Sequence, residues 1–192
     1  MQIQLYDNLI PGTRLKQSDM DNLTGLDFLK KVFFISDGVM LTQIRDISGI
    51  DSSTLQNWTK RGWVANSKLK RYNIDQVAHI LIINMLRSCM QLDKIAFLIE
   101  YINGKVGDAS DDIISDSVLY DYICRILQYM TQKESCPLDS ISSYVSKVTA
   151  DYVEPVEGAR ERLNHALEVI VVTYYATLIK QHATELLARL EA

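Results

Sequence analysis

Residues 40–58 read MLTQIRDISGIDSSTLQNW, and this stretch predicts a helix, a tight turn and a second helix. Leu41, Ile44 and Ile47 are apolar at a spacing of three, which places them on one face of a short helix. Gly49 follows at the position where a helix C-cap favours a positive φ. The first helix is therefore expected to end just before this glycine.

The second helix of the motif is predicted over residues 52–61, with Gly62 ending it. The three residues at 51–53 are Asp, Ser and Ser, which are all favourable N-cap types. Leu55 and Trp58, again three apart, are expected to face the core.

The outward face of the second helix is polar. In a helix-turn-helix, the N-terminal residues and the outward face of the second helix enter the major groove of DNA. Gln and Asn side chains can each form a bidentate pair with adenine. The residues predicted to read bases are Ser53, Gln56 and Asn57.

Positive charge is concentrated around this motif. No acidic residue lies between Asp51 and Asp75, although the whole chain has a formal net charge of −4. Residues 63–64 and 69–72 are expected to form two short strands of a hairpin, or wing, around a polar turn at 66–68. Clustered cations on such a motif indicate a surface that meets phosphates. The predicted phosphate contacts are Arg45, Lys60, Lys68, Lys70 and Arg71.

The order of elements over residues 38–105 resembles the head domain of MerR-type regulators. Two apolar helices are predicted after the wing, at about 75–88 and 93–102, and Asn103-Gly104 closes the second. The resemblance rests on Ile44, Gly49, Ile50, Thr54, Leu55, Trp58, Gly62, Val64, Lys70, Tyr72, Val77, Ile80, Gln91-Leu92 and Ile95.

The resemblance implies a winged DNA-binding fold that works as a dimer on an inverted repeat. The run from Trp58 to Tyr72 is most similar to an uncharacterised group, a domain of unknown function with a MerR-like head. Gln56 stands where the family usually has Arg, and about 35 residues precede the head instead of its starting the chain. The implied DNA-binding residues are Arg45, Ser52, Ser53, Thr54, Gln56, Asn57, Lys60, Arg61, Lys68, Lys70, Arg71 and Tyr72. Tyr72 and Trp58 also suit core positions, and Trp63 fits either environment.

The fold class predicted for the whole chain is all-α, a winged helix-turn-helix followed by a C-terminal helical bundle. Three prolines, eight glycines and a hydrophobic content of 47% in 192 residues favour long helices around a packed core. The predicted parts are an N-terminal arm with a short helix at 1–37, the head at 38–105, a linker at 106–112 and a C-terminal domain at 113–192. Helices of that domain are expected at about 112–132, 139–150 and 155–190.

The long last helix has an apolar stripe and an apolar centre. Val169 to Ala176 is apolar on nearly every side, which predicts neighbours on more than one face, or alternatively a buried strand. Extending a heptad lands on polar residues, so a small bundle is favoured over a long two-stranded coiled coil. This domain would dimerise the protein or receive a signal from an unknown effector. The stripe consists of Leu163, Leu167, Ile170, Tyr174, Leu178, Leu186 and Leu190.

The sequence offers no basis for an enzyme, a cofactor or a metal site. It lacks a Gly-rich phosphate loop, a paired-Cys motif and a Gly-x-Ser-x-Gly elbow. His165 with Glu168, and His182 with Glu185, fit surface pairs on one helix better than a di-metal site. The three cysteines Cys89, Cys124 and Cys136 are scattered, and reduced thiols in the cytoplasm are expected. No membrane span or signal peptide is expected either.

The sequence supports two functions. The first is a cytoplasmic, homodimeric transcriptional regulator that binds double-stranded DNA. The alternative is a helical protein–protein adaptor that uses the winged head to hold a partner protein, which the acidic overall balance favours.

Overall fold

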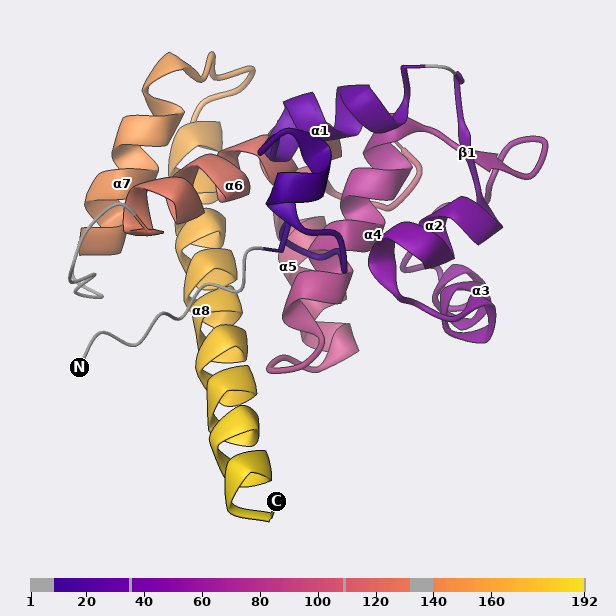
Figure 1. Ribbon diagram of the computed structural model, residues 1–192. Helices are drawn as coiled ribbons and strands as arrows, with labels where there is room; N and C mark the ends of the chain where they lie inside the picture. Colours follow the sequence, from indigo (N-terminus) through magenta and orange to yellow (C-terminus); the bar gives the residue numbers. More distant parts are fainter. Residues whose placement is uncertain (1–8, 35, 109, 132–139, 192) are drawn as a thin grey trace.

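The computed structural model describes residues 9–34, 36–108, 110–131 and 140–191. Helix α4 (Ile74–Leu86) lies at the centre of the fold, and nine of its 13 residues are buried. A helix that is apolar all round needs neighbours on several faces. Helices α1, α2, α5, α6 and α8 supply them, so α4 joins the N-terminal and C-terminal parts of the chain (Figure 1).

The chain is mainly helical, as predicted. The helices before α4 are η1 (Gln17–Met20), α1 (Gly25–Val32), α2 (Leu41–Ser48) and α3 (Ser52–Lys60). Those after it are α5 (Leu92–Asn103), α6 (Asp116–Thr131), α7 (Ile141–Val148), η3 (Thr149–Asp151) and α8 (Ala159–Glu191). The segment between the helices predicted at 112–132 and 139–150, and the first eight residues of the predicted arm, lie outside the described residues.

A two-stranded antiparallel sheet is present, but it is not the predicted hairpin. Strand β1 (Val39–Met40) pairs with β2 (Arg71–Tyr72), with Val39 opposite Tyr72. The expected first strand at 63–64 is absent, and the segment that follows it is bound to the Gln76 side chain instead. Gln76 Nε2 donates to the carbonyls of residues 65 and 66 at 3.3 and 3.0 Å.

The turn that precedes β2 lies two residues later than predicted. Lys68 and Arg71 exchange both backbone hydrogen bonds, at 3.0 and 2.9 Å. Leu69 and Lys70 between them have φ of +50° and +62°, the pattern of a two-residue hairpin turn. Leu69 is 96% exposed, so this turn protrudes from the surface.

The described part of the N-terminal arm packs on the chain's own helices. Ile10 is fully buried, and the Tyr120 hydroxyl of α6 donates to the Pro11 carbonyl at 2.6 Å. Asn84 of α4 donates to the Gly12 carbonyl at 2.9 Å. One continuous core therefore runs from the arm through the head to α8.

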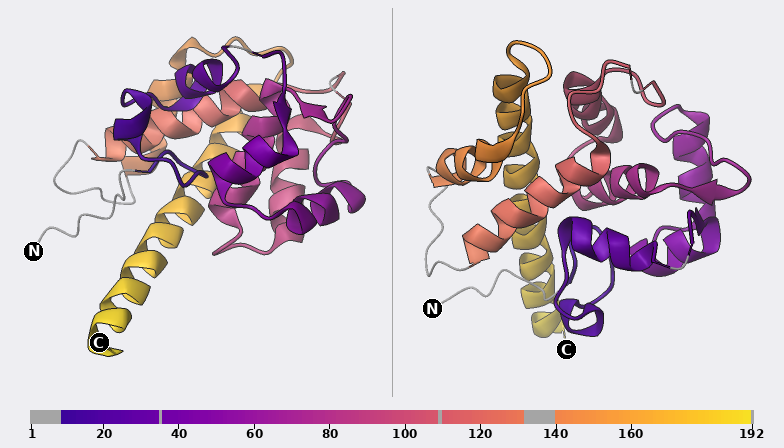
Figure 2. Two further views of the ribbon diagram at one scale, coloured as in Figure 1. Left: turned by 45° about the vertical axis from the view of Figure 1, so that its right-hand side comes forward. Right: turned by 90° about the horizontal axis from the view of Figure 1, so that it is seen from above.

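Helix α8 confirms the helical alternative for Val169–Ala176 but divides the predicted apolar stripe in two. Leu163, Leu167 and Ile170 are fully buried, whereas Leu190 is 84% exposed. The division arises because α8 continues beyond the helices it packs on, and its C-terminal end projects from the body (Figures 1 and 2).

Candidate nucleic-acid interface

A turn at residues 49–51 joins α2 to α3. Gly49 has φ +74° and its N–H donates to the Arg45 carbonyl at 2.8 Å, closing α2 as the sequence predicts. Ile50 is buried, which ties the turn to the core. Asn84 Nδ2 of α4 donates to the Ser48 carbonyl at 3.0 Å and holds the turn from behind.

Helix α3 has one buried and one exposed face. Leu55 and Trp58 are each 1% exposed and fix the inner face to the core. Gln56, Asn57 and Lys60 are exposed on the outer face. The helix lies at the margin of the molecule, across the fold from α7 and α8 (Figure 1). The outer face of α3 is therefore open to a partner.

The first turn of α3 is occupied by its own cap. Asp51 accepts from the Thr54 N–H at 2.8 Å and from the Thr54 hydroxyl at 2.7 Å, and the Ser53 hydroxyl also donates to it. These hydroxyls and the Thr54 N–H hold the pKa of Asp51 well below its usual range. Ser53 and Thr54 thus support the helix start. Farther along the helix, Gln56 is exposed, and Asn57 Oδ1 accepts from Arg61 Nε at 3.4 Å. Ser52 is half-buried at the start of the helix.

Most of the cations predicted to contact DNA are exposed. Lys60, Lys68 and Lys70 are exposed. Arg45 is also exposed, with its Nε 3.5 Å from Asp46. Arg61 is exposed, but its guanidinium lies over the Trp63 ring, 5.1 Å from the centroid.

Arg71 and Tyr72 have structural partners. Arg71 Nη1 donates to the Ser36 hydroxyl and to the Gly38 carbonyl, both at 2.8 Å. These bonds fasten β2 to the segment before β1. Tyr72 is 7% exposed and belongs to the core. The sequence allowed this core position as the alternative to a DNA contact.

Arg14 is a cation of this surface that the sequence analysis missed. Its Nε donates to the Asp46 carbonyl at 2.9 Å, and its backbone N–H donates to the Ile47 carbonyl at 3.0 Å. The side chain is exposed at the C-terminus of α2, where the helix dipole favours a cation. Only the folding of the arm onto α2 brings Arg14 there, so no local pattern could have revealed it.

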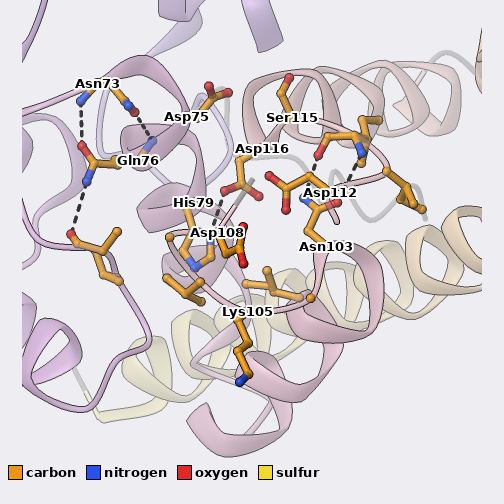
Figure 3. A pocket seen from close by; sticks show the side chains of 18 of the residues that line it. Asn73, Asp75, Gln76, His79, Asn103, Lys105, Asp108, Asp112, Ser115 and Asp116 are labelled. Atoms are coloured by element: carbon orange, nitrogen blue, oxygen red, sulfur yellow. Dashed lines mark hydrogen bonds and ion pairs between the residues drawn. The ribbon is translucent and has the colours of Figure 1, made fainter. Parts of the chain in front are cut away.

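A cavity of about 960 Å³ lies between the start of α4 and the segment at 104–116. Asp75, Asp108, Asp112 and Asp116 line it, with His79 at its wall (Figure 3). Burial and then the charge of Asp116 raise the pKa of Asp112 to about 6. The loop after α3 also lines the cavity, and the four aspartates outnumber the two lysines there, Lys68 and Lys105.

His79 connects the head to α6 at the wall of this cavity. Its Nδ1 lies 2.9 Å from Asp116 Oδ2 (Figure 3). Its Nε2 lies 2.9 Å from the Trp63 carbonyl. Burial opposes the charged ring, but the hydrogen bond and charge of Asp116 outweigh it and raise the pKa of His79. The side chain is thus a buried structural link between α4 and α6.

The histidines and cysteines singled out in the sequence form no metal site among the described residues. Over the described ranges, no group of three or more His, Cys, Asp or Glu side chains could hold a metal ion. His182 Nδ1 and Glu185 Oε2 form a surface pair 3.9 Å apart. Cys89 is exposed and Cys124 is buried. Burial raises the pKa of the Cys124 thiol to about 12. Within the part of the chain that the structure describes, no helix has the length and apolarity needed to cross a bilayer.

Comparison with known proteins gives a family but no activity. The uncharacterized protein YkrK of Bacillus subtilis (strain 168) is 25% identical over 134 residues, which are 68% of this chain and 54% of YkrK. The chain thus spans about half the length of that relative. No solved structure matches the chain. Residues 26–124, just over half of the chain and including the whole α2–α3 motif, match a domain of unknown function, DUF1836. The chain therefore belongs to the DUF1836 family.

Proposed function

We propose that this protein is a cytoplasmic DNA-binding transcriptional regulator, in which a MerR-like head places α3 in the major groove. The observation that carries the proposal is the outer face of α3. Gln56, Asn57 and Lys60 are exposed there on a helix whose inner face and preceding turn are held by the core. A rigid helix that offers amides and a cation has the chemistry needed to read base edges.

The cations around α3 support contacts to the DNA backbone on both sides of that helix. Arg14 and Arg45 lie at the α2 end of the motif. Lys68 and Lys70 belong to the protruding turn before β2. In the proposed complex, these side chains position the head on phosphates while Gln56 provides specificity. A homodimer would present two such heads to an inverted repeat.

The proposal is tested by capturing genomic DNA fragments with the purified chain. An enriched inverted-repeat sequence is the expected result. A Lys60→Glu, Lys70→Glu double variant should lose the enrichment, because two attractive phosphate contacts become repulsive. Lys30→Glu is the matched control, since Lys30 is an exposed residue of α1, which packs on α6. Fragments without any common sequence would contradict a sequence-reading function.

A protein–protein adaptor is the second candidate, and one observation favours it. Phe97 and Tyr101 on α5 are 65% and 41% exposed, with ring centroids 6.4 Å apart. Exposed aromatic pairs of this kind are enriched at protein interfaces. Heparin chromatography separates the two functions, because a DNA-binding head should be retained and an adaptor should pass through.

A further inference from the structure

Leu69 is a large apolar side chain at the tip of the turn before β2. It is 96% exposed, more than any other large apolar side chain that the structure describes. Burial of such a side chain stabilises a fold, and Leu69 gains none of that stabilisation. Figure 1 shows the turn extending beside β1, at the same margin of the molecule as α2 and α3. An apolar tip thus lies on the surface proposed to meet DNA.

The backbone at this tip is also unfavourable for the residues that occupy it. Leu69 and Lys70 have φ of +50° and +62°, in the left-handed region. Two-residue turns of this kind favour Asn-Gly, because a Cβ is strained at positive φ. Neither burial nor backbone preference therefore accounts for a leucine here. Residues that their surroundings hold in a strained conformation are typical of functional sites.

The turn is held rigidly by the strands behind it. Lys68 and Arg71 exchange both backbone hydrogen bonds, at 3.0 and 2.9 Å. Arg71 Nη1 donates to the Ser36 hydroxyl and to the Gly38 carbonyl, both at 2.8 Å. A Cβ at Gly38 would lie 2.8 Å from the Arg71 Cβ, so this glycine permits the close contact. A tip fixed in this way loses little conformational entropy when it binds.

Two cations flank the apolar tip. Lys68 and Lys70 are both exposed, and no acidic residue lies between Asp51 and Asp75. The tip therefore combines one apolar side chain with a positive charge on each side of it along the chain. The minor groove of DNA has the complementary arrangement, with phosphates along both walls and stacked base pairs at its floor.

The size of the turn also fits this groove. The minor groove of B-DNA is about 6 Å wide, whereas an α-helix with its side chains is about 10–12 Å across. A helix such as α3 requires the major groove, but the tip of a two-residue turn can enter the minor groove. Proteins that bind there frequently insert a Leu, Ile, Phe or Met side chain between base pairs and kink the duplex.

We propose that Leu69 is a wedge that enters the minor groove and partly unstacks one base step, while Lys68 and Lys70 contact the flanking phosphates. The inference rests on the proposed function, since α3 in the major groove would bring the turn to the adjacent minor groove. One leucine offers far less apolar area than the patches, on the order of several hundred Å², that mark protein or membrane interaction sites. A wedge between two base pairs needs only one side chain.

A wedge of this kind makes binding sensitive to a base step that forms no hydrogen bond with the protein. Pyrimidine–purine steps, such as TA and CA, are easily kinked and unstacked. The complex should therefore favour DNA with such a step at the position of the turn. Leu69 would add this preference to the base contacts of Gln56.

Binding and bending of two DNA duplexes by the whole chain test the proposal. Both duplexes are about 30 base pairs long and carry dyes at their ends, and one contains several TA steps while the other contains no pyrimidine–purine step. Binding of the unmodified chain should raise the energy transfer between the dyes on the TA duplex, because a kink brings the ends closer. A 2-aminopurine in place of the adenine of a TA step should brighten, since its fluorescence increases when it is unstacked.

Leu69→Asn is the decisive variant, because asparagine tolerates a positive φ and keeps the turn while the apolar side chain is removed. It should weaken binding to the TA duplex about fivefold, abolish the bend and the brightening, and leave binding to the other duplex within about twofold. Leu69→Met should behave as the unmodified chain does, since it keeps an apolar side chain at the tip. Val153→Asn is the matched control, since Val153 is 85% exposed in the segment before α8.

The outcomes separate the wedge from the function on which it rests. Binding of both duplexes without bending or brightening would overturn the wedge and leave the DNA-binding function standing. A Leu69→Asn variant that bends the TA duplex as the unmodified chain does would have the same meaning. A chain that binds neither duplex at low salt would overturn both the wedge and the proposed function.

Discussion

His79 Nδ1 lies 2.9 Å from Asp116 Oδ2, and this contact joins α4 to α6 in the core. Because the folded protein raises the pKa of His79 above 6.5, the contact stabilises the fold fully below pH 6.5. The stabilisation is lost as the pH rises through the pKa of the folded state. Urea unfolding at pH 5.5, 7 and 8.5 should therefore give a falling free energy of unfolding.

Replacing this histidine tests the origin of that pH dependence. His79→Gln should cost about 1–3 kcal/mol at pH 6, because a buried hydrogen-bonded group is lost and Asp116 is left without its cation. The same change should flatten the pH profile between 6.5 and 8.5. An unchanged profile would assign the dependence to another group. The surface residue His165 provides the control, since His165→Gln should alter neither quantity.

Gly49 is a position where the turn between α2 and α3 requires a particular backbone. At φ +74°, an L-residue with a Cβ is strained, so Gly49→Ala should destabilise the protein by about 1–2 kcal/mol. Gly49→Asn should cost less, since Asn tolerates this conformation. Thermal unfolding of the three proteins measures the order. Equal stability of the Ala and Asn variants would indicate that steric contact, and not φ, sets the cost.

Under the proposed function, Gln56 and Lys70 should affect DNA binding in different ways. Gln56→Ala should weaken binding to the selected inverted repeat by about 1–3 kcal/mol per base contact and leave binding to a random duplex unchanged. Lys70→Glu should weaken binding to both duplexes. Fluorescence anisotropy with the two DNAs gives the comparison. A uniform loss in Gln56→Ala would mean that this amide contacts no base.

Arg14 tests whether the folded arm contributes to the same surface. Arg14→Gln should reduce the affinity for a random duplex by a few fold and should make the salt dependence shallower by about one unit, because one phosphate contact is removed. Arg71 is unsuitable for this purpose, since its guanidinium holds the segment before β1. Identical salt slopes for Arg14→Gln and the unmodified chain would exclude Arg14 from the interface.

Local sequence predicted the α2–α3 motif well, because its signals act over a few residues. Asp51 caps α3 through the adjacent Thr54, and Gly49 ends α2 through its own φ. Helix α2 consequently ends just before Gly49 as expected, and α3 begins at the expected residue and ends one residue earlier than expected. The inward placement of Leu55 and Trp58 follows from the helical period in the same way.

Features that depend on distant contacts were not predictable in this way. The pairing of β2 with β1 joins residues far apart in the sequence, and the position of Arg14 depends on the arm folding onto α2. In α8, the apolar stripe is visible in the sequence, but only the packing of the body decides which part of it is buried. The acidic cavity likewise combines Asp75 with residues some 40 positions later.

The most direct test of the central claim is a salt titration of binding to a random DNA duplex. If a dimer neutralises about six phosphates, the logarithm of the affinity should fall with the logarithm of salt concentration at a slope near −5. Such a slope, reduced in the Lys60→Glu, Lys70→Glu variant, is the predicted result. A flat response, or no binding at low salt, would contradict the claim that the surface around α3 meets DNA.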